Sequence, residues 1–224
     1  MAAVRLPNRP GQGPEVRFRP EAGVGQVAGW HGIVSWQLVI PTKLCDCFCA
    51  FNTSKQKLGR TSYAMPVPAH LSTFWSEFAK ATGSAHDECY YEAFFFGDSE
   101  EVANELAELV LKGTKRATAG ALWSYEAEGQ RLPQPGDLSI VTDWSGNPLC
   151  VIETQSVEVV PFLEVTAEFA ATEGEGDGSL AFWQRAHREF FTRECATAGR
   201  EFSESMRVVC ERFAVVYRPA TSAA

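Results

Sequence analysis

The chain has 224 residues, is 45% hydrophobic and carries a formal net charge of −8. This length is sufficient for one well-buried core. The apolar run 33–40 is closed by Pro41 and is far too short for a membrane-spanning helix, which takes about 20 residues. Seven cysteines, an odd number in a sequence without a secretory signal, indicate reduced thiols and a cytoplasmic protein.

Charge divides the chain into two parts. Residues 1–64 contain eight Lys or Arg and three Asp or Glu, a net charge of +5, which leaves −13 for residues 65–224. The first forty residues are rich in Gly and Pro and cannot bury enough apolar surface to offset their ordering entropy. We therefore expect residues 1–64 to be disordered or an upstream extension of the reading frame, and 65–224 to form the domain. Cys45-x-Cys47-x-Cys49 lacks the CxxC spacing and fourth ligand of a zinc site.

The first elements of the domain follow from periodicity and caps. Apolar residues at helical spacing predict an amphipathic helix over 71–82, with Ser72 as its cap and Gly83 as its end. Aromatic residues predict a strand over 92–97. Asp98, with a glutamate three residues later, predicts the start of a second helix, and Gly113 predicts its end in a left-handed cap.

Two strands, 138–143 and 149–160, are separated by a short Gly- and Pro-containing turn and predict a β-hairpin. A short helix is expected over 166–171, and Ser179 is a good cap for a helix that runs to about residue 195. The segment 207–217 is apolar on both faces, which predicts a central strand. Strands interspersed with helices indicate the α+β class.

Gly113 is followed by Thr114, Lys115 and Arg116, and the only basic residues between Lys80 and Arg131 are Lys112, Lys115 and Arg116. A lone cationic spot in an acidic domain suggests a site for one small anionic or polar ligand. Cations beyond a helix end are also favoured by the helix dipole alone, so both interpretations stay open. A lysine on a turn makes few packing contacts, so Lys115→Ala is expected to cost little stability.

Lys115 and Thr118 are close enough in sequence to share a site. A lysine whose pKa is lowered, by burial or by Arg116, can act as a base and activate the Thr118 hydroxyl. A carboxylate would complete such a set, and the candidates lie in the run Glu173-Gly174-Glu175-Gly176-Asp177. Asp177 is more simply explained by the positive N-terminal end of the next helix.

Other residues have either structural or ligand-binding interpretations. Trp123 follows the cationic turn, and aromatic rings of this kind hold single-stranded or flipped bases by stacking. His187, on the apolar side of its helix, is expected to be a packed residue outside the site. Glu153, Cys210 and Glu211 are expected to be structural, with Arg207 or Arg212 as partners of the buried carboxylates.

An ordered set of short motifs extends from about Pro68 to Tyr217. It comprises Phe95-Phe96-Gly97-Asp98, Lys115-x-x-Thr118, Leu132-Pro133 with Gly136-Asp137, Cys150-Val151-Ile152-Glu153-Thr154, Pro161-Phe162, the acidic run at 173–177 and Val208-Val209-Cys210-Glu211-Arg212-Phe213. This set resembles the ASCH family of the PUA-like superfamily. The resemblance implies a small β-barrel, mixed and mainly antiparallel, with helices around its mouth.

The resemblance also implies a function. The longer subgroup, which carries the Glu-Gly-Glu-Gly-Asp run, is described as RNA-binding, with ribonuclease activity in some members. This implies binding of RNA, a nucleotide or a nucleobase beside Lys115, with Arg116, Trp123 and Glu175 as contacts. No cofactor is expected, except that a metal-dependent ribonuclease would hold Mg²⁺ or Mn²⁺ with Glu173 or Glu175.

Two alternatives remain beside RNA binding. ASCH members that resemble amidohydrolases of N4-acetylcytidine use a lysine, a threonine and a glutamate, which match Lys115, Thr118 and Glu173; Gly120 stands where that subgroup has an arginine. The other alternative is a non-enzymatic interaction module that uses an exposed aromatic face of the helix at 71–82. No phosphate-binding Gly-rich motif for nucleoside triphosphates is present.

Overall fold

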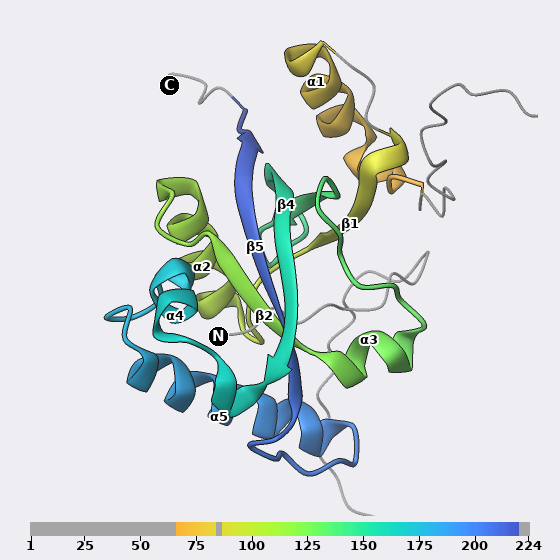
Figure 1. Ribbon diagram of the computed structural model, residues 1–224. Coiled ribbons are helices and arrows are strands. Elements are labelled where there is room, and N and C mark those ends of the chain that lie inside the picture. The colour runs from red at the N-terminus through yellow and green to blue at the C-terminus, as the bar shows by residue number, and fades with distance from the viewer. Residues whose placement is uncertain (1–65, 84–86, 220–224) are drawn as a thin grey trace, which may run out of the picture. The chain divides into compact units, whose positions relative to one another are not determined.

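The computed structural model describes residues 66–83 and 87–219. The predictions for residues 1–64, including the cysteines at 45, 47 and 49, lie outside these ranges. The described chain forms one five-stranded sheet surrounded by helices (Figure 1). The strands are β1 (Tyr90–Phe94), β2 (Ala117–Ala121), β3 (Leu138–Thr142), β4 (Pro148–Pro161) and β5 (Arg207–Tyr217), and the α-helices are α1 (Ser72–Thr82), α2 (Glu100–Lys112), α3 (Leu122–Glu128), α4 (Ala167–Glu173) and α5 (Leu180–Thr197).

The sheet has the order β1-β3-β4-β5-β2. β1 and β3 are parallel, whereas the β3–β4, β4–β5 and β2–β5 pairs are antiparallel. The predicted α+β class with a mixed, mainly antiparallel sheet is therefore confirmed. β1 and β2 are the two edges, and no pairing between them closes the sheet within the described ranges. β5 lies between two strands, as its apolar faces predicted.

Most predicted elements are present, but β2 and α3 were not predicted. The β2 sequence, Ala117 to Ala121, has only small residues, so it gives little local strand signal. It is a strand because its backbone pairs with β5 over its whole length. Thr118 consequently lies within a strand instead of on a turn. β1 also begins earlier than predicted, at Tyr90.

The helix caps agree in part with the sequence patterns. Gly83 and Gly113 adopt the left-handed conformation expected of C-caps, and Ser179 caps α5 by accepting a hydrogen bond from the Phe182 N–H. The cap of α2 is Ser99, however, and not Asp98. Ser72 is the first residue of α1 instead of its cap.

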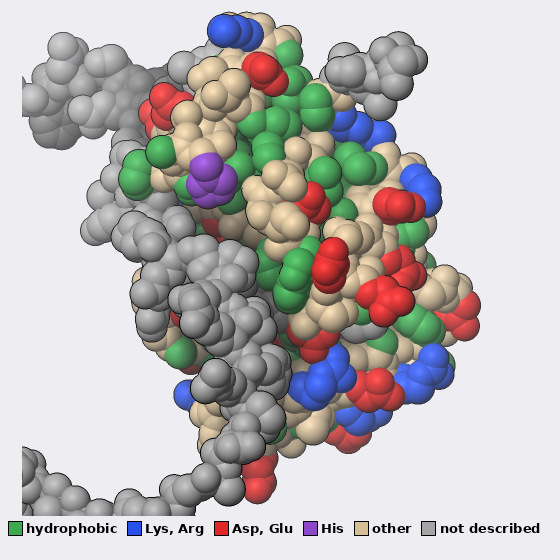
Figure 2. Space-filling model, turned by 180° about the vertical axis from the view of Figure 1, so that it is seen from behind, with side chains coloured by type: hydrophobic (Ala, Val, Ile, Leu, Met, Phe, Trp, Pro, Cys, Tyr) green, Lys and Arg blue, Asp and Glu red, His purple; other side chains and the backbone are tan. Residues whose placement is uncertain are grey.

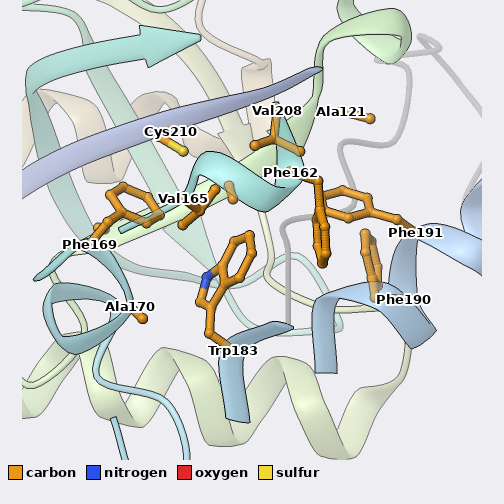
Figure 3. Close-up of a cluster of buried hydrophobic side chains, with 12 residues drawn as sticks. Ala121, Phe162, Val165, Phe169, Ala170, Trp183, Phe190, Phe191, Val208 and Cys210 are labelled. Carbon is orange, nitrogen blue, oxygen red and sulfur yellow. The ribbon is translucent and has the colours of Figure 1, made fainter. Parts of the chain in front are cut away.

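Two clusters of buried side chains lie toward opposite edges of the sheet, one at β1 and β3 and the other at β2 and β5. The aromatic face of α1 is buried against β1 and β3, with Phe74, Trp75 and Phe78 at most 8% exposed. At the other end, α4 and α5 pack on β2 and β5 through the aromatic cluster of Figure 3, in which Trp183 points toward Phe162. This second cluster matters for function because it fixes α4 and α5 against β2.

Cysteine and membrane predictions can be compared with the described chain. Its four cysteines, at 89, 150, 195 and 210, form no disulfide. Across the same ranges, no helix combines the length and apolar content that crossing a bilayer requires.

Candidate active site

A buried cluster of charged side chains lies where the α2–β2 link meets the end of α4. The Nζ of Lys115 is 2.7 Å from Oε1 of Glu175 and 3.6 Å from Oε2 of Glu173. Lys115 and Glu173 have no exposed surface, and Glu175 is 6% exposed. Lys115 Nζ also lies 5.1 Å from the ring centre of Phe96, at a distance suited to a cation–π contact. We refer to Lys115, Glu173, Glu175 and His187 as the Lys115 cluster.

This burial contradicts the expectation that Lys115 is a turn residue with few contacts. The sequence placed it correctly after the left-handed cap at Gly113, whose φ is 78°. The link then turns inward because the N–H of Arg116 donates to the carbonyl of Thr172 in α4. This tertiary hydrogen bond, which no local pattern predicts, places Lys115 beneath α4.

Gly174 allows the two segments to approach this closely. Its φ is +65°, and a Cβ at this position would lie 2.4 Å from the carbonyl oxygen of Thr114. A Cβ at Gly176 would similarly meet the ring of Phe182 at 2.4 Å. The glycines of the Glu-Gly-Glu-Gly-Asp run thus let the acidic residues pack directly on the Lys115 link.

We expect Gly174→Ala to destabilise the domain by more than about 2 kcal/mol, because left-handed strain of roughly 1–2 kcal/mol adds to a backbone clash. Gly199→Ala is the matched control: its φ is +66°, but nothing lies within 4 Å of an added Cβ, so it should cost only the left-handed strain of roughly 1–2 kcal/mol. Urea unfolding of both variants measures the difference. Equal losses would show that the Gly174 contact is unimportant.

His187 of α5 belongs to the cluster, although the sequence analysis left it out. Its Nε2 lies 3.4 Å from Glu173 Oε2, its Nδ1 lies 3.0 Å from the carbonyl oxygen of Trp183, and its ring stacks on the Trp183 indole at 4.1 Å. A neutral imidazole has one N–H and can donate to only one of these acceptors, whereas imidazolium donates to both. The contact with Glu173 is therefore a place where the cluster can take up a proton.

For each of Lys115, Glu173 and His187, burial and the neighbouring opposite charge shift the pKa in opposite directions. Burial lowers the pKa of Lys115, and Glu173 counteracts this by stabilising the ammonium. Burial lowers the pKa of His187 to about 4, again against the effect of Glu173, so the ring is neutral near pH 7. Burial raises the pKa of Glu173, but the charges of Lys115 and His187 outweigh it, so that the pKa is lowered. Such opposing shifts within one buried set are typical of functional sites.

Thr118 is buried in β2, and its Oγ1 has no hydrogen-bond partner in the described chain. It faces β5 in register with Glu211, but the Glu211 carboxylate accepts a 2.6 Å hydrogen bond from Thr154. Glu211 is thus buried, as predicted, and a threonine hydroxyl contacts it, while Arg207 donates to the carbonyl of Val159 and Arg212 to Glu168. An unpaired buried hydroxyl calls for an explanation, because most such groups are satisfied.

The other predicted ligand contacts lie elsewhere. The Arg116 side chain is exposed, while its backbone bonds to Thr172 and Phe213. Trp123, in the first turn of α3, lines a pocket against α5 whose wall includes none of the Lys115 cluster. Asp177 accepts a hydrogen bond from the N–H of Ser179 at the start of α5, which is the structural role predicted for it.

A sequence model of the family described as ASCH domain matches residues 92–217, more than half of the chain. This segment includes every member of the Lys115 cluster and Thr118. The chain belongs to the ASCH domain family. No curated protein matches it at a significant level.

Two solved structures show the same fold. The crystal structure of an ASCH domain from Lactobacillus crispatus JV V101 is 40% identical, with a TM-score of 0.62, and the match covers 70% of this chain and 99% of that one. A protein from Enterococcus faecalis V583 is 33% identical, with a TM-score of 0.59, over 65% of this chain and 87% of its own. The ASCH family resemblance drawn from the sequence motifs is therefore confirmed.

The ASCH domain of this chain does not form an obvious divalent-metal centre. No group of three or more His, Cys, Asp or Glu side chains suited to a metal ion occurs in residues 66–83 and 87–219. The two carboxylates suggested as ligands, Glu173 and Glu175, both contact the Lys115 ammonium. A divalent ion would have to displace that ammonium, so the Lys115 cluster is better suited to proton transfer and binding of a polar group.

His187 of this ASCH domain was assigned to packing in the sequence analysis, and Glu194 was not considered there. His187 lies four residues after Trp183 on a helix that begins directly after the acidic run, so its position on the buried face could have pointed to the carboxylates. Glu194 continues the same buried stripe of α5, and burial, with the charge of Glu128, raises its pKa to about 7. The sequence signal for Glu194 was a charged residue within an otherwise apolar stripe of the helix.

The raised pKa of Glu194 predicts a pH effect on stability. The folded chain keeps a proton on Glu194 up to about pH 7, whereas the unfolded chain loses it near pH 4.3, so stability should fall between about pH 5 and pH 7 and level off above that. At about 1.4 kcal/mol per pKa unit, the loss of stability attributable to this group is roughly 3–4 kcal/mol. Urea unfolding should show Glu194→Gln to lack this loss, while Glu189→Gln, at an exposed position of α5, retains it. Parallel pH profiles for both variants would contradict the assignment.

Proposed function

We propose that this chain binds RNA, or a nucleotide derived from it, at the Lys115 cluster, and that the cluster provides acid–base groups for hydrolysis of the bound molecule. The observation that carries the proposal is the desolvated set of Lys115, Glu173 and His187, together with the unpaired hydroxyl of Thr118 three residues after Lys115. In a cluster with a purely structural role, we would expect each buried polar group to have a hydrogen-bond partner. Membership of the ASCH family supports a nucleic-acid ligand, because the subgroup it resembles is described as RNA-binding.

The ligand segment must be short. The part of the chain from residue 65 onward carries a net charge of −13. In the view of Figure 2, Lys and Arg side chains are interspersed with Asp and Glu and form no continuous basic field among the coloured residues. Long backbone contacts need such a field. One or a few nucleotides at a local cationic group are compatible with this surface.

Glu175 is the least buried member of the cluster, so we place the approach of a ligand to Lys115 at its side chain. A ligand phosphate can take the place of the Glu175 carboxylate, because both offer anionic oxygens to the Lys115 ammonium. Ligand binding and the Lys115–Glu175 ion pair then compete. Glu175→Gln, which weakens that ion pair, should therefore bind the ligand more tightly than the parent chain.

The cluster can assist cleavage of RNA by accepting a proton and by stabilising negative charge. The Glu173–His187 pair accepts the proton of a ribose 2′-hydroxyl, whose oxygen attacks the adjacent phosphorus. A 2′,3′-cyclic phosphate forms, the P–O5′ bond breaks, and the departing 5′-oxygen takes a proton from solvent water. Lys115 stabilises the charge that develops on the phosphate oxygens. General acid–base groups of this kind contribute about 10²–10⁴-fold to a rate.

A second candidate is amidohydrolysis of an N4-acylated cytidine, favoured by the 3.6 Å contact of Lys115 with Glu173 and the unpaired hydroxyl of Thr118. The described chain lacks the hydrogen bond from Thr118 to a base that nucleophilic attack needs, so this candidate ranks second. The interaction-module alternative has less support, because the aromatic face of α1 on which it depended is buried.

The test uses the full chain with two probes, a labelled mixed-sequence single-stranded RNA and N4-acetylcytidine. We expect saturable RNA binding by fluorescence anisotropy and slow RNA cleavage on gels. Thr118→Val separates the candidates: RNA binding should largely persist, whereas an amidohydrolase using Thr118 should lose turnover and keep affinity. Lys80→Ala, which replaces an exposed lysine of α1, serves as a surface-charge control. Absence of binding and turnover with both probes would refute the proposal.

A further inference from the structure

A pocket of about 400 Å³ lies between α3 and α5, apart from the Lys115 cluster. Its apolar wall includes Trp123 and Phe190, and Glu194 contributes a carboxyl group. The remaining lining residues are Asp98, Ser124, Ala127, Glu128, Arg193, Thr197 and Ala198. This volume falls within the range of small-molecule sites, which combine apolar walls with a few polar groups.

The pocket has a negative electrostatic balance. Among the described residues that line it, the single cationic side chain is that of Arg193, which is paired with Asp98 at 2.8 Å. Glu128 lies near enough to repel the Glu194 carboxylate. The Arg200 guanidinium, which is outside the lining, lies 5.0 Å from the Trp123 ring centre, so this indole already accepts one cation. The surroundings therefore favour a positively charged occupant.

Glu194 has an incompletely satisfied carboxyl group. Its Oε2 is buried without a hydrogen-bond partner in the described chain. Cys195 lies beside it on α5, and the Glu194 charge contributes to the raised pKa of that thiol, after burial. A buried carboxyl oxygen with no donor is costly. A ligand that brings N–H donors and positive charge would remove that cost.

We propose that this pocket binds a small organic cation with a flat apolar body, which packs against Trp123 and Phe190 and donates hydrogen bonds from an amidinium or ammonium group to Glu194. The apolar wall accounts for the body of the ligand and the carboxylate for its charged head. The site is independent of the function proposed for the Lys115 cluster.

Proton linkage gives this site a distinctive signature. A cation binds the ionised form of Glu194, and that carboxyl is only partly ionised near neutral pH. Binding should therefore release protons and weaken about tenfold between pH 8 and pH 6. Heats of binding measured at one pH in buffers of different ionisation enthalpy report the released protons directly.

The experiment is isothermal titration of the full chain with benzamidinium chloride, and with benzamide as a neutral molecule of the same shape. We expect benzamidinium to bind with a Kd below about 1 mM at pH 8, and benzamide at least tenfold more weakly. Glu194→Gln should lose at least tenfold in affinity together with the pH dependence. Glu189→Gln, exposed on the same helix, should behave like the parent. No saturable binding by the parent, equal affinity for benzamide, or unchanged affinity in Glu194→Gln would each overturn the proposal.

Discussion

Replacement of Lys115 by alanine is expected to lower the free energy of unfolding by about 3–5 kcal/mol, the usual cost of breaking a buried ion pair by removing one partner. The change leaves Glu173 and Glu175 buried without the ammonium that both contact. It also removes a fully buried side chain that lies over Phe96. Urea unfolding of the full chain measures the loss.

Two further variants make this result interpretable. Lys112→Ala removes a lysine from an exposed i,i+4 pair with Glu108, where both side chains are about two-thirds exposed, so it should change stability by less than about 0.5 kcal/mol. Lys115→Met combined with Glu175→Gln keeps the volume and removes one stranded charge, so it should recover part of the lost stability. If Lys115→Ala is as stable as Lys112→Ala, the buried cluster does not form in solution.

Glu173→Gln is expected to abolish hydrolysis while leaving the fold intact. The glutamine is nearly isosteric and the remaining Lys115–Glu175 pair is electrically balanced, but the lowered pKa of Glu173 shows that the fold favours its ionised form, so we expect a loss of stability of up to about 3 kcal/mol. The variant loses the carboxylate that faces His187 at 3.4 Å and with it the proposed proton acceptor. We expect a loss of at least about 10²-fold in turnover, with binding of RNA retained.

Single-turnover assays and anisotropy on the same preparation separate the two effects. Glu168→Gln is a suitable control, because this residue lies on α4 as Glu173 does but is highly exposed and contacts Arg212 only at 3.4 Å. It should keep full activity. Undiminished turnover in Glu173→Gln would remove Glu173 from the mechanism, and reduced binding with unchanged turnover would make it a ligand contact instead.

The local sequence determined much of the fold because many of its signals are complete within a few residues. The cap at Gly113, the cap at Ser179 and the β3–β4 hairpin each need only neighbouring residues to form, and all three are present. β5 was recognised as central because apolar residues occupy both of its faces. The ordered motifs also identified the family, since each preserves a turn, cap or strand at a defined place.

Elements without a local signal depended on the sheet and the core. The alanine-rich segment at 117–121 is a strand because β5 supplies its hydrogen-bond partners. Thr118 is buried for the same reason. The aromatic residues of α1 pack on β1 and β3, so the exposed aromatic patch that would favour the interaction-module hypothesis is not formed by Phe74, Trp75 and Phe78.

For the candidate site, the sequence by itself named Lys115 and Thr118 after a glycine turn and the carboxylates of the run 173–177, from which the family resemblance selected Glu173. Only the tertiary structure decided that Lys115 is buried, since the hydrogen bond from Arg116 to Thr172 draws the link beneath α4. It also shows that His187 contacts Glu173 in the Lys115 cluster and that Trp123 lines a separate pocket. The physical reason is that caps and turns form from neighbouring residues, whereas burial and ion pairing of a side chain depend on segments that meet only when the chain has folded.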